Sequence, residues 1–203
     1  MKRQLNPVMF TRLLVCVLWV CAWMAALQFG SQRAHAGSDT WADVSDFTQY
    51  VPLAWAVGRT FHAADSEGAF QLAAAGIATV GSSELLKRAI NERRPNYKPG
   101  DRRRSFPSGH VAKAWFAAAH LQRRFGCYEL EWSCWRGSTI PYAAAVATAV
   151  GRVRADRHHV RDVIASAVIA EAWVWFTTDR FDVDAGVAPS FDNGFGIAIF
   201  KKF

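Results

Sequence analysis

The 203-residue sequence contains only four cysteines and no CxxC pair, so it has neither a disulfide framework nor a zinc-binding pattern. It also has no internal repeat and no low-complexity segment, and charged residues make up 20% of the chain. A disordered or collagen-like chain is therefore excluded. What is abundant is apolar surface, at 51% of residues with 9 tryptophans and 14 phenylalanines. This composition indicates one domain with a thick core or a membrane-facing surface.

The first 36 residues have the features of a targeting segment. They contain lysine and arginine but no acidic residue, an apolar run from Leu13 to Leu27, and the small-x-small sequence Ala34-His35-Ala36. This pattern predicts a signal peptide cleaved after Ala36 and export of a mature chain to the periplasm. An uncleaved anchor helix is the alternative, although the apolar run is shorter than the ~20 residues of a usual span.

Export changes the interpretation of the cysteines, because two of the four lie in the signal peptide. Cys127 and Cys134 remain in a Trp-rich connector, and an exported protein meets an oxidising compartment. We predict a disulfide bond between them.

Small apolar residues dominate five stretches, which we predict to be helices, at roughly 42–62, 68–91, 109–125, 139–154 and 157–178. Asp65 is expected to cap the second and Asp156 the fifth. The predicted fold class is all-α: a bundle of about five or six helices over residues 37–183, followed by a short C-terminal β-hairpin or extended tail over 184–203.

Long uncharged runs are missing from the mature chain. The longest are Gly68–Ser83 and Gly137–Gly151, of 16 and 15 residues. Because a membrane span needs ~18–20 residues, we expect a buried bundle, with peripheral contact to an anionic membrane left open.

Positive charge is concentrated between Lys87 and Arg104, where eight basic residues accompany two acidic ones. Such a local cluster favours a small anionic ligand or an anionic surface over extended nucleic-acid binding. We therefore expect no nucleic-acid partner. A solvated basic loop is the alternative interpretation.

Three segments contain nearly all of the informative polar residues: KRAINERRP with Lys87 and Arg94, SFPSGH with Ser108, Gly109 and His110, and GRVRADRHHVRD with Arg152, His158 and Asp162. The lysine and the two arginines are suited to phosphate oxygens. The PSGH sequence lies where a loop becomes a helix, so that backbone N–H groups can bind an anion. These features predict a site for a tetrahedral oxyanion.

The predicted nucleophile is a histidine. His158 and Asp162 are spaced i, i+4 on the predicted fifth helix, so the carboxylate can fix the imidazole tautomer and leave the other nitrogen free to attack. His110 would protonate the leaving oxygen and then activate water. We expect neither a metal nor a cofactor, since cationic side chains stabilise the charge, and we expect His159 to be structural.

In this order and spacing the segments resemble the signature of the type 2 phosphatidic acid phosphatase superfamily: K-x6-R-P, P-S-G-H and S-R-x5-H-x3-D. The superfamily includes bacterial non-specific acid phosphatases and vanadium haloperoxidases. The resemblance extends from Lys87 to Asp162 and implies an α-helical bundle. It also implies His110 as the general acid, His158 as the nucleophile that forms a phosphohistidine, Asp162 as its assistant, and phosphate binding by Lys87, Arg94, Ser108, Gly109 and Arg152.

One position departs from the signature, because Gly151 stands where the family usually has serine. The departure removes a hydroxyl near Arg152 and alters how that arginine is held. We expect activity to be retained, because the charged groups and both histidines are present.

The resemblance and the targeting segment together predict an exported phosphatase acting on a phosphomonoester or pyrophosphate. The high apolar content slightly favours a lipid phosphate over a soluble substrate. A soluble periplasmic acid phosphatase is the main alternative. A vanadate-dependent haloperoxidase and a non-enzymatic anion-binding module are weaker ones, since the former lacks any halide or peroxide signature and the latter leaves the histidines unexplained.

Overall fold

The computed structural model describes residues 38–100, 103–126, 132–179, 185–190 and 196–201. The helices are α2 (Ser38–Thr48), α3 (Val51–His62), α4 (Ser66–Ile90), α5 (Gly109–Phe125), α6 (Trp132–Arg154) and α7 (Val160–Thr177). The helical fold class expected from the sequence is confirmed. Strands β1 (Ala185–Ser190) and β2 (Gly196–Lys201) pair antiparallel. The predicted signal peptide lies outside the described residues, and so does Cys127 of the predicted Cys127–Cys134 disulfide.

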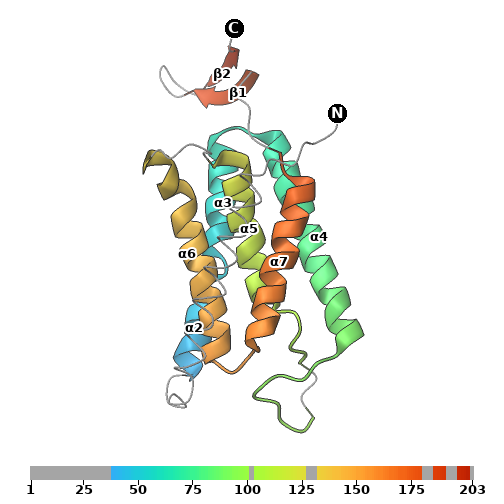
Figure 1. Ribbon diagram of the computed structural model, residues 1–203. Helices are drawn as coiled ribbons and strands as arrows, with labels where there is room; N and C mark the ends of the chain where they lie inside the picture. The colour runs from blue at the N-terminus through green and yellow to red at the C-terminus, as the bar shows by residue number, and fades with distance from the viewer. Residues whose placement is uncertain (1–37, 101–102, 127–131, 180–184, 191–195, 202–203) are drawn as a thin grey trace.

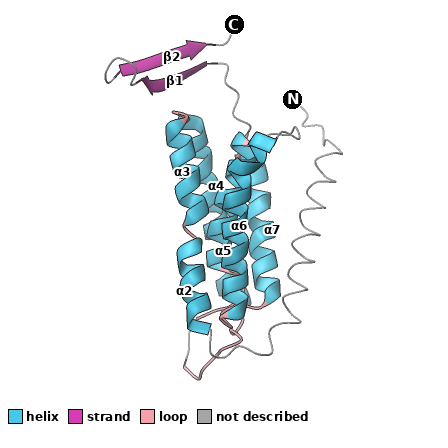
Figure 2. Cartoon of the chain, turned by 90° about the vertical axis from the view of Figure 1, so that its left-hand side faces the viewer, coloured by secondary structure: helices cyan, strands magenta, loops and turns pink. Residues whose placement is uncertain are grey.

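The long helices run side by side, and α5 lies among α3, α4, α6 and α7 (Figures 1 and 2). The sequence of α5 explains its central place, because its apolar residues are buried on every side rather than along one stripe. Alanines at 112, 114, 117 and 118 are fully buried and allow the neighbouring helices to approach closely.

The single helix predicted over 42–62 is two helices. Residues 49–50 form a turn, and α3 starts immediately before Pro52. Proline lacks the N–H that a helix interior requires but is compatible with the first turn of a new helix. The break therefore lies where the proline places it, and α2 and α3 follow one another along one side of the bundle (Figure 2).

Helix caps set the ends of α4 and α7. The Asp65 carboxylate accepts a hydrogen bond of 2.8 Å from the Gly68 N–H, as the sequence predicted. The predicted Asp156 cap of the last helix is wrong. Asp156 has a φ of 53° in a turn, and His159 caps α7 instead, with the Asp162 carboxylate accepting from its N–H at 2.8 Å.

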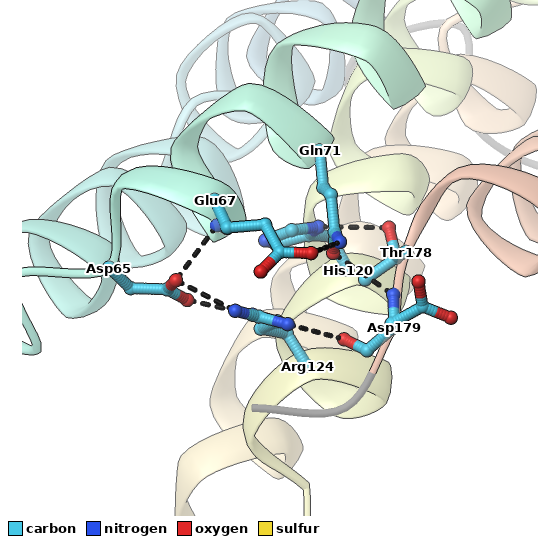
Figure 3. Close-up of polar contacts among 8 residues, drawn as sticks. Asp65, Glu67, Gln71, His120, Arg124, Thr178 and Asp179 are labelled. Carbon is cyan, nitrogen blue, oxygen red and sulfur yellow. Dashed lines mark hydrogen bonds and ion pairs between the residues drawn. The ribbon is translucent and has the colours of Figure 1, made fainter. Parts of the chain in front are cut away.

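A buried polar network closes the end of the bundle where α4 begins and α5 and α7 finish (Figure 3). Arg124 donates two hydrogen bonds of 2.7 Å to the two carboxylate oxygens of Asp65. Gln71 accepts from the Asp179 N–H at 2.9 Å, and His120 Nδ1 lies 3.1 Å from the Thr178 hydroxyl. The network joins three helices at the end opposite the motif residues.

Among the described helices, α4 alone is long and apolar enough to cross a membrane, judged by length and composition. It has 25 residues, and 28% of its most apolar window is buried. When only runs without charged residues are counted, no segment after residue 36 is expected to reach the length of a membrane span. That expectation is wrong for α4. The helix continues past Ser83 through charged residues of its last turns.

Candidate functional site

The three motif segments meet at one end of the bundle, where α4 and α6 finish and α5 and α7 begin (lower end in Figure 1). A pocket of about 270 Å³ opens there. It is lined by Val80, Ser83, Glu84, Lys87, Gly109, His110 and Lys113. The fold thus brings the lysine of the first motif against the glycine and histidine of the second.

Gly109 leaves space for the Lys87 ammonium group at the start of α5. A Cβ atom at Gly109 would lie 2.9 Å from Lys87 Nζ, closer than real Cβ contacts allow. Lys87 Nζ also pairs with Glu84 Oε1 at 2.7 Å. The glycine of the second motif therefore leaves room for a cation beside the helix N-terminus, as an anion site requires.

Ser108 is fully buried at the N-terminus of α5. Its N–H donates to the Asp162 carbonyl at 3.3 Å, which ties the second motif to the third. Its hydroxyl has no hydrogen-bond partner within the described part of the chain. A buried hydroxyl without a partner costs free energy, and a phosphate oxygen would satisfy it.

Arg94 lies in the loop between α4 and α5 and is half-buried. Its Nε donates to the Arg104 carbonyl at 3.2 Å, and Arg104 Nη1 donates to the Lys87 carbonyl at 3.4 Å. These hydrogen bonds fold the loop back onto the end of α4. Lys87 and Arg94 of the first motif therefore lie at the same end of the bundle.

His158 and Asp162 are adjacent, but not in the way that the sequence predicted. Because α7 begins at Val160, His158 belongs to the loop before it, and only Asp162 is helical. His158 Nδ1 lies 3.6 Å from Asp162 Oδ2, and the two side chains are 2% and 0% exposed. Asp162 is held by the His159 N–H and by the hydroxyl of Ser105. The pair is therefore a loop-to-helix contact fixed by the cap of α7.

Burial lowers the pKa of His158, and Arg94 and Arg152 lower it further, while Asp162 raises it. His158 is thus neutral near pH 7, the form that a nucleophile needs. Burial raises the pKa of Asp162, but the adjacent His158 ring and the hydrogen bonds from Ser105 and the His159 N–H outweigh burial and hold that pKa below its ordinary value. Asp162 therefore stays ionised and can hold the imidazole in one tautomer.

His159, expected to be structural, points to a different partner. Its side chain is 39% exposed, and Nε2 lies 3.5 Å from Glu92 Oε1. Glu92 also receives a hydrogen bond from Arg161. These contacts lie in the loop region outside the group formed by His158, Asp162 and Ser108.

Arg152 is 5% exposed and is held by α2, a helix distant in sequence. Its Nη1 lies 2.7 Å from Asp46 Oδ1 and 3.2 Å from the Ser45 hydroxyl, while its Nε has no partner in the described ranges. Ser45 of α2 thus places a hydroxyl beside Arg152, next to Gly151, which has none. Gly151 permits this, since a Cβ there would lie 2.7 Å from Ser45 Cβ and 2.8 Å from the Trp41 carbonyl oxygen.

Restoring the family serine at this position should harm the protein. We expect Gly151→Ser to push α2 away from α6, to cost about 1–3 kcal/mol of unfolding free energy, and to lower activity. Thermal unfolding and phosphate-release rates measure the two effects. Gly58→Ala is the matched control, because a Cβ at Gly58 meets nothing within 4 Å. An unchanged melting temperature in Gly151→Ser would refute the tight contact.

Three further residues belong to the site and were not singled out from the sequence: Ser105, Asp46 and Lys113. Ser105 lies inside the SFPSGH segment, so its place beside the motif was a usable signal. Lys113 follows His110 by three residues on α5, a helical spacing that brings it to the same pocket. Asp46 has no such signal, because it precedes the first motif by some forty residues.

The family model of the PAP2 superfamily matches residues 68–183, more than half of the chain, and the chain belongs to this superfamily. It is 30% identical over 124 residues to a lipid A 1-phosphatase of Helicobacter pylori, covering 59% of this chain and 61% of that protein's length.

A solved structure has a similar fold. It is a transmembrane PAP2 type phosphatidylglycerolphosphate phosphatase from Bacillus subtilis, with a TM-score of 0.53 at 18% identity. The match covers 82% of this chain and 92% of that one. The helical arrangement of the family is thus present over most of the chain.

Proposed function

We propose that this chain is an exported, metal-independent phosphatase that hydrolyses a phosphomonoester or pyrophosphate, with a lipid phosphate as substrate, through a phosphohistidine intermediate. The observation that carries the proposal is one cluster: a pocket lined by Lys87, Gly109 and His110, next to the buried pair of His158 and Asp162. Family membership and the lipid A 1-phosphatase relative support the same activity.

The proposed first step is attack by His158 on phosphorus. Since Nδ1 faces Asp162, Nε2 is the attacking nitrogen, and its lone pair forms the new N–P bond. The P–O bond to the leaving group breaks as His110 donates a proton to the departing oxygen. Lys87, Arg94 and Arg152 balance the charge that develops on the phosphoryl oxygens.

In the second step, neutral His110 takes a proton from water, and the hydroxide attacks the phosphohistidine. Inorganic phosphate leaves, and His158 regains its lone pair. Burial, followed by Arg152 and Lys113, lowers the pKa of His110 to about 3, so this histidine is neutral in the free protein. A bound phosphate anion raises that pKa, which allows His110 to serve first as the acid and then as the base.

The exposed surface of α4 supports a lipid substrate. Phe70, Ile77 and Leu85 are 75%, 75% and 68% exposed, and Val80 of the same helix lines the pocket. Seven residues of helix, about 10 Å, separate Val80 from Lys87. A lipid whose phosphate binds at Lys87 can therefore rest its apolar part against α4, in contact with the membrane.

The test compares two substrates. We expect phosphate release by residues 37–203 to be faster from a detergent-dispersed lipid phosphate than from a water-soluble phosphomonoester. Ile77→Gln should raise KM for the lipid and leave hydrolysis of the soluble ester unchanged. Val57→Gln, at an exposed position of α3, is the matched control. Faster release from the soluble ester, with no effect of Ile77→Gln, would instead indicate a soluble acid phosphatase.

A further inference from the structure

Helix α2 lies outside the residues that match the family model, yet one of its side chains joins two groups of the site. Asp46 Oδ1 lies 3.0 Å from His110 Nε2 and 2.7 Å from Arg152 Nη1. A single carboxylate oxygen thus contacts both the histidine of the second motif and the arginine of the third. The Asp46 side chain is 56% exposed, so it keeps part of its hydration while making these contacts.

Packing of α2 on α6 fixes where this carboxylate lies. Gly151 lets α2 come close, Ser45 contacts Arg152, and the hydroxyls of Thr48 and Thr148 lie 2.8 Å apart. These contacts occur before and after Asp46 along α2. The carboxylate is therefore held by a rigid helix and not by a loop.

The charges around His110 come from several elements. Asp46 faces it from α2, Arg152 from α6, Lys113 from its own helix and His158 from the loop before α7. Lys87 of α4 lines the same pocket. Burial, Arg152, Lys113 and His158 all lower the pKa of His110, whereas Asp46 raises it.

A neutral imidazole has one N–H and one lone pair, and its hydrogen-bond partner decides which nitrogen has the proton. A carboxylate can only accept, so a carboxylate beside Nε2 selects the tautomer with the proton on Nε2. The same logic applies to Asp162 and Nδ1 of His158. Each histidine of the site thus has a carboxylate at one ring nitrogen.

We propose that Asp46 is a positioning residue of this site: it accepts the Nε2–H bond of His110, fixes the ring beside Arg152, and leaves Nδ1 to gain and lose the proton that the reaction moves. The role of His110 as acid and base rests on the proposed function. The contact and the tautomer do not depend on it.

Kinetics of Asp46→Ala test the role in the reaction. We expect kcat to fall on the order of 10-fold or more, within the contribution of general acid catalysis, with KM changed much less. Asp46→Asn keeps an acceptor without the charge and should lie between Ala and wild type. Asp43→Asn, an exposed carboxylate on the same helix, should behave as wild type. A lower KM with unchanged kcat would mean that Asp46 merely competes with phosphate, and it would overturn the proposal.

Nitrogen NMR of ¹⁵N-histidine-labelled protein tests the contact without turnover. The His110 signals are identified by their loss in His110→Gln. We expect the Nε2–H tautomer in wild type and a mixture or the Nδ1–H tautomer in Asp46→Ala, with the melting temperature measured in parallel. An unchanged His110 spectrum in Asp46→Ala overturns the proposal. If wild type releases no phosphate, the proposed function fails, and the tautomer measurement still decides whether Asp46 positions His110.

Discussion

Replacing His158 by alanine should reduce phosphate release by roughly three or more orders of magnitude while the bundle stays folded. The loss follows because the nitrogen that forms the N–P bond is gone. The fold should persist because Asp162 keeps its contacts with Ser105 and the His159 N–H. Phosphate release and circular dichroism of the purified variant measure the two parts of this expectation.

A labelled substrate sharpens the test of the nucleophile. Brief reaction with a ³²P-labelled substrate followed by a denaturing quench should leave an acid-labile phosphoenzyme in wild type and none in His158→Ala. His62→Ala is the matched control, because His62 is exposed on α3 and belongs to no motif. Near-native turnover in His158→Ala would remove His158 from its assigned role.

Arg124→Met should destabilise the protein by about 3–5 kcal/mol, because it leaves the Asp65 carboxylate buried without its partner. The two side chains are 5% and 3% exposed and share two hydrogen bonds of 2.7 Å (Figure 3). Chemical unfolding of the variant measures the loss. Arg88→Met, at an exposed position of α4, is the control and should change stability little.

A double variant separates charge burial from lost packing. Asp65→Asn keeps a side-chain oxygen for the α4 cap but removes the charge. Asp65→Asn combined with Arg124→Met should therefore be more stable than Arg124→Met alone. If the double variant loses the sum of the two single losses, the destabilisation does not come from an unpaired charge.

The same pair predicts a dependence on acid. Burial raises the pKa of Asp65, but its bonds with Arg124 and the Gly68 N–H outweigh burial and hold that pKa below its ordinary value. A carboxyl group with a depressed folded-state pKa adds stability above its unfolded pKa, and this stability is lost as the pH falls through the folded pKa. Wild type should therefore lose stability in acid more steeply than the double variant.

Much of the site was predictable because each motif is short. Spacing within KRAINERRP, SFPSGH and GRVRADRHHVRD is set by local backbone geometry, so the residues that meet at one end of the bundle could be named in advance. Cap chemistry was predictable for Asp65 and not for Asp156. Asp156 and His159 both precede α7, and His159 is the cap because the Asp162 carboxylate accepts a hydrogen bond from its N–H. Asp162 also contacts Ser105 and the His158 ring, which are contacts of the tertiary structure.

The amino-acid sequence by itself determined the helical class, the approximate extent of α4, α5 and α7, and the set of cationic, imidazole and carboxylate groups in the three motifs. Only the tertiary structure decided that Ser45 and Asp46 of α2 hold Arg152 and that Asp46 reaches His110. It also decided that Gly151 leaves the space in which α2 packs. The reason is physical. A residue's neighbours along a helix follow from the helical repeat, whereas contact across more than a hundred residues depends on how closely two helices pack.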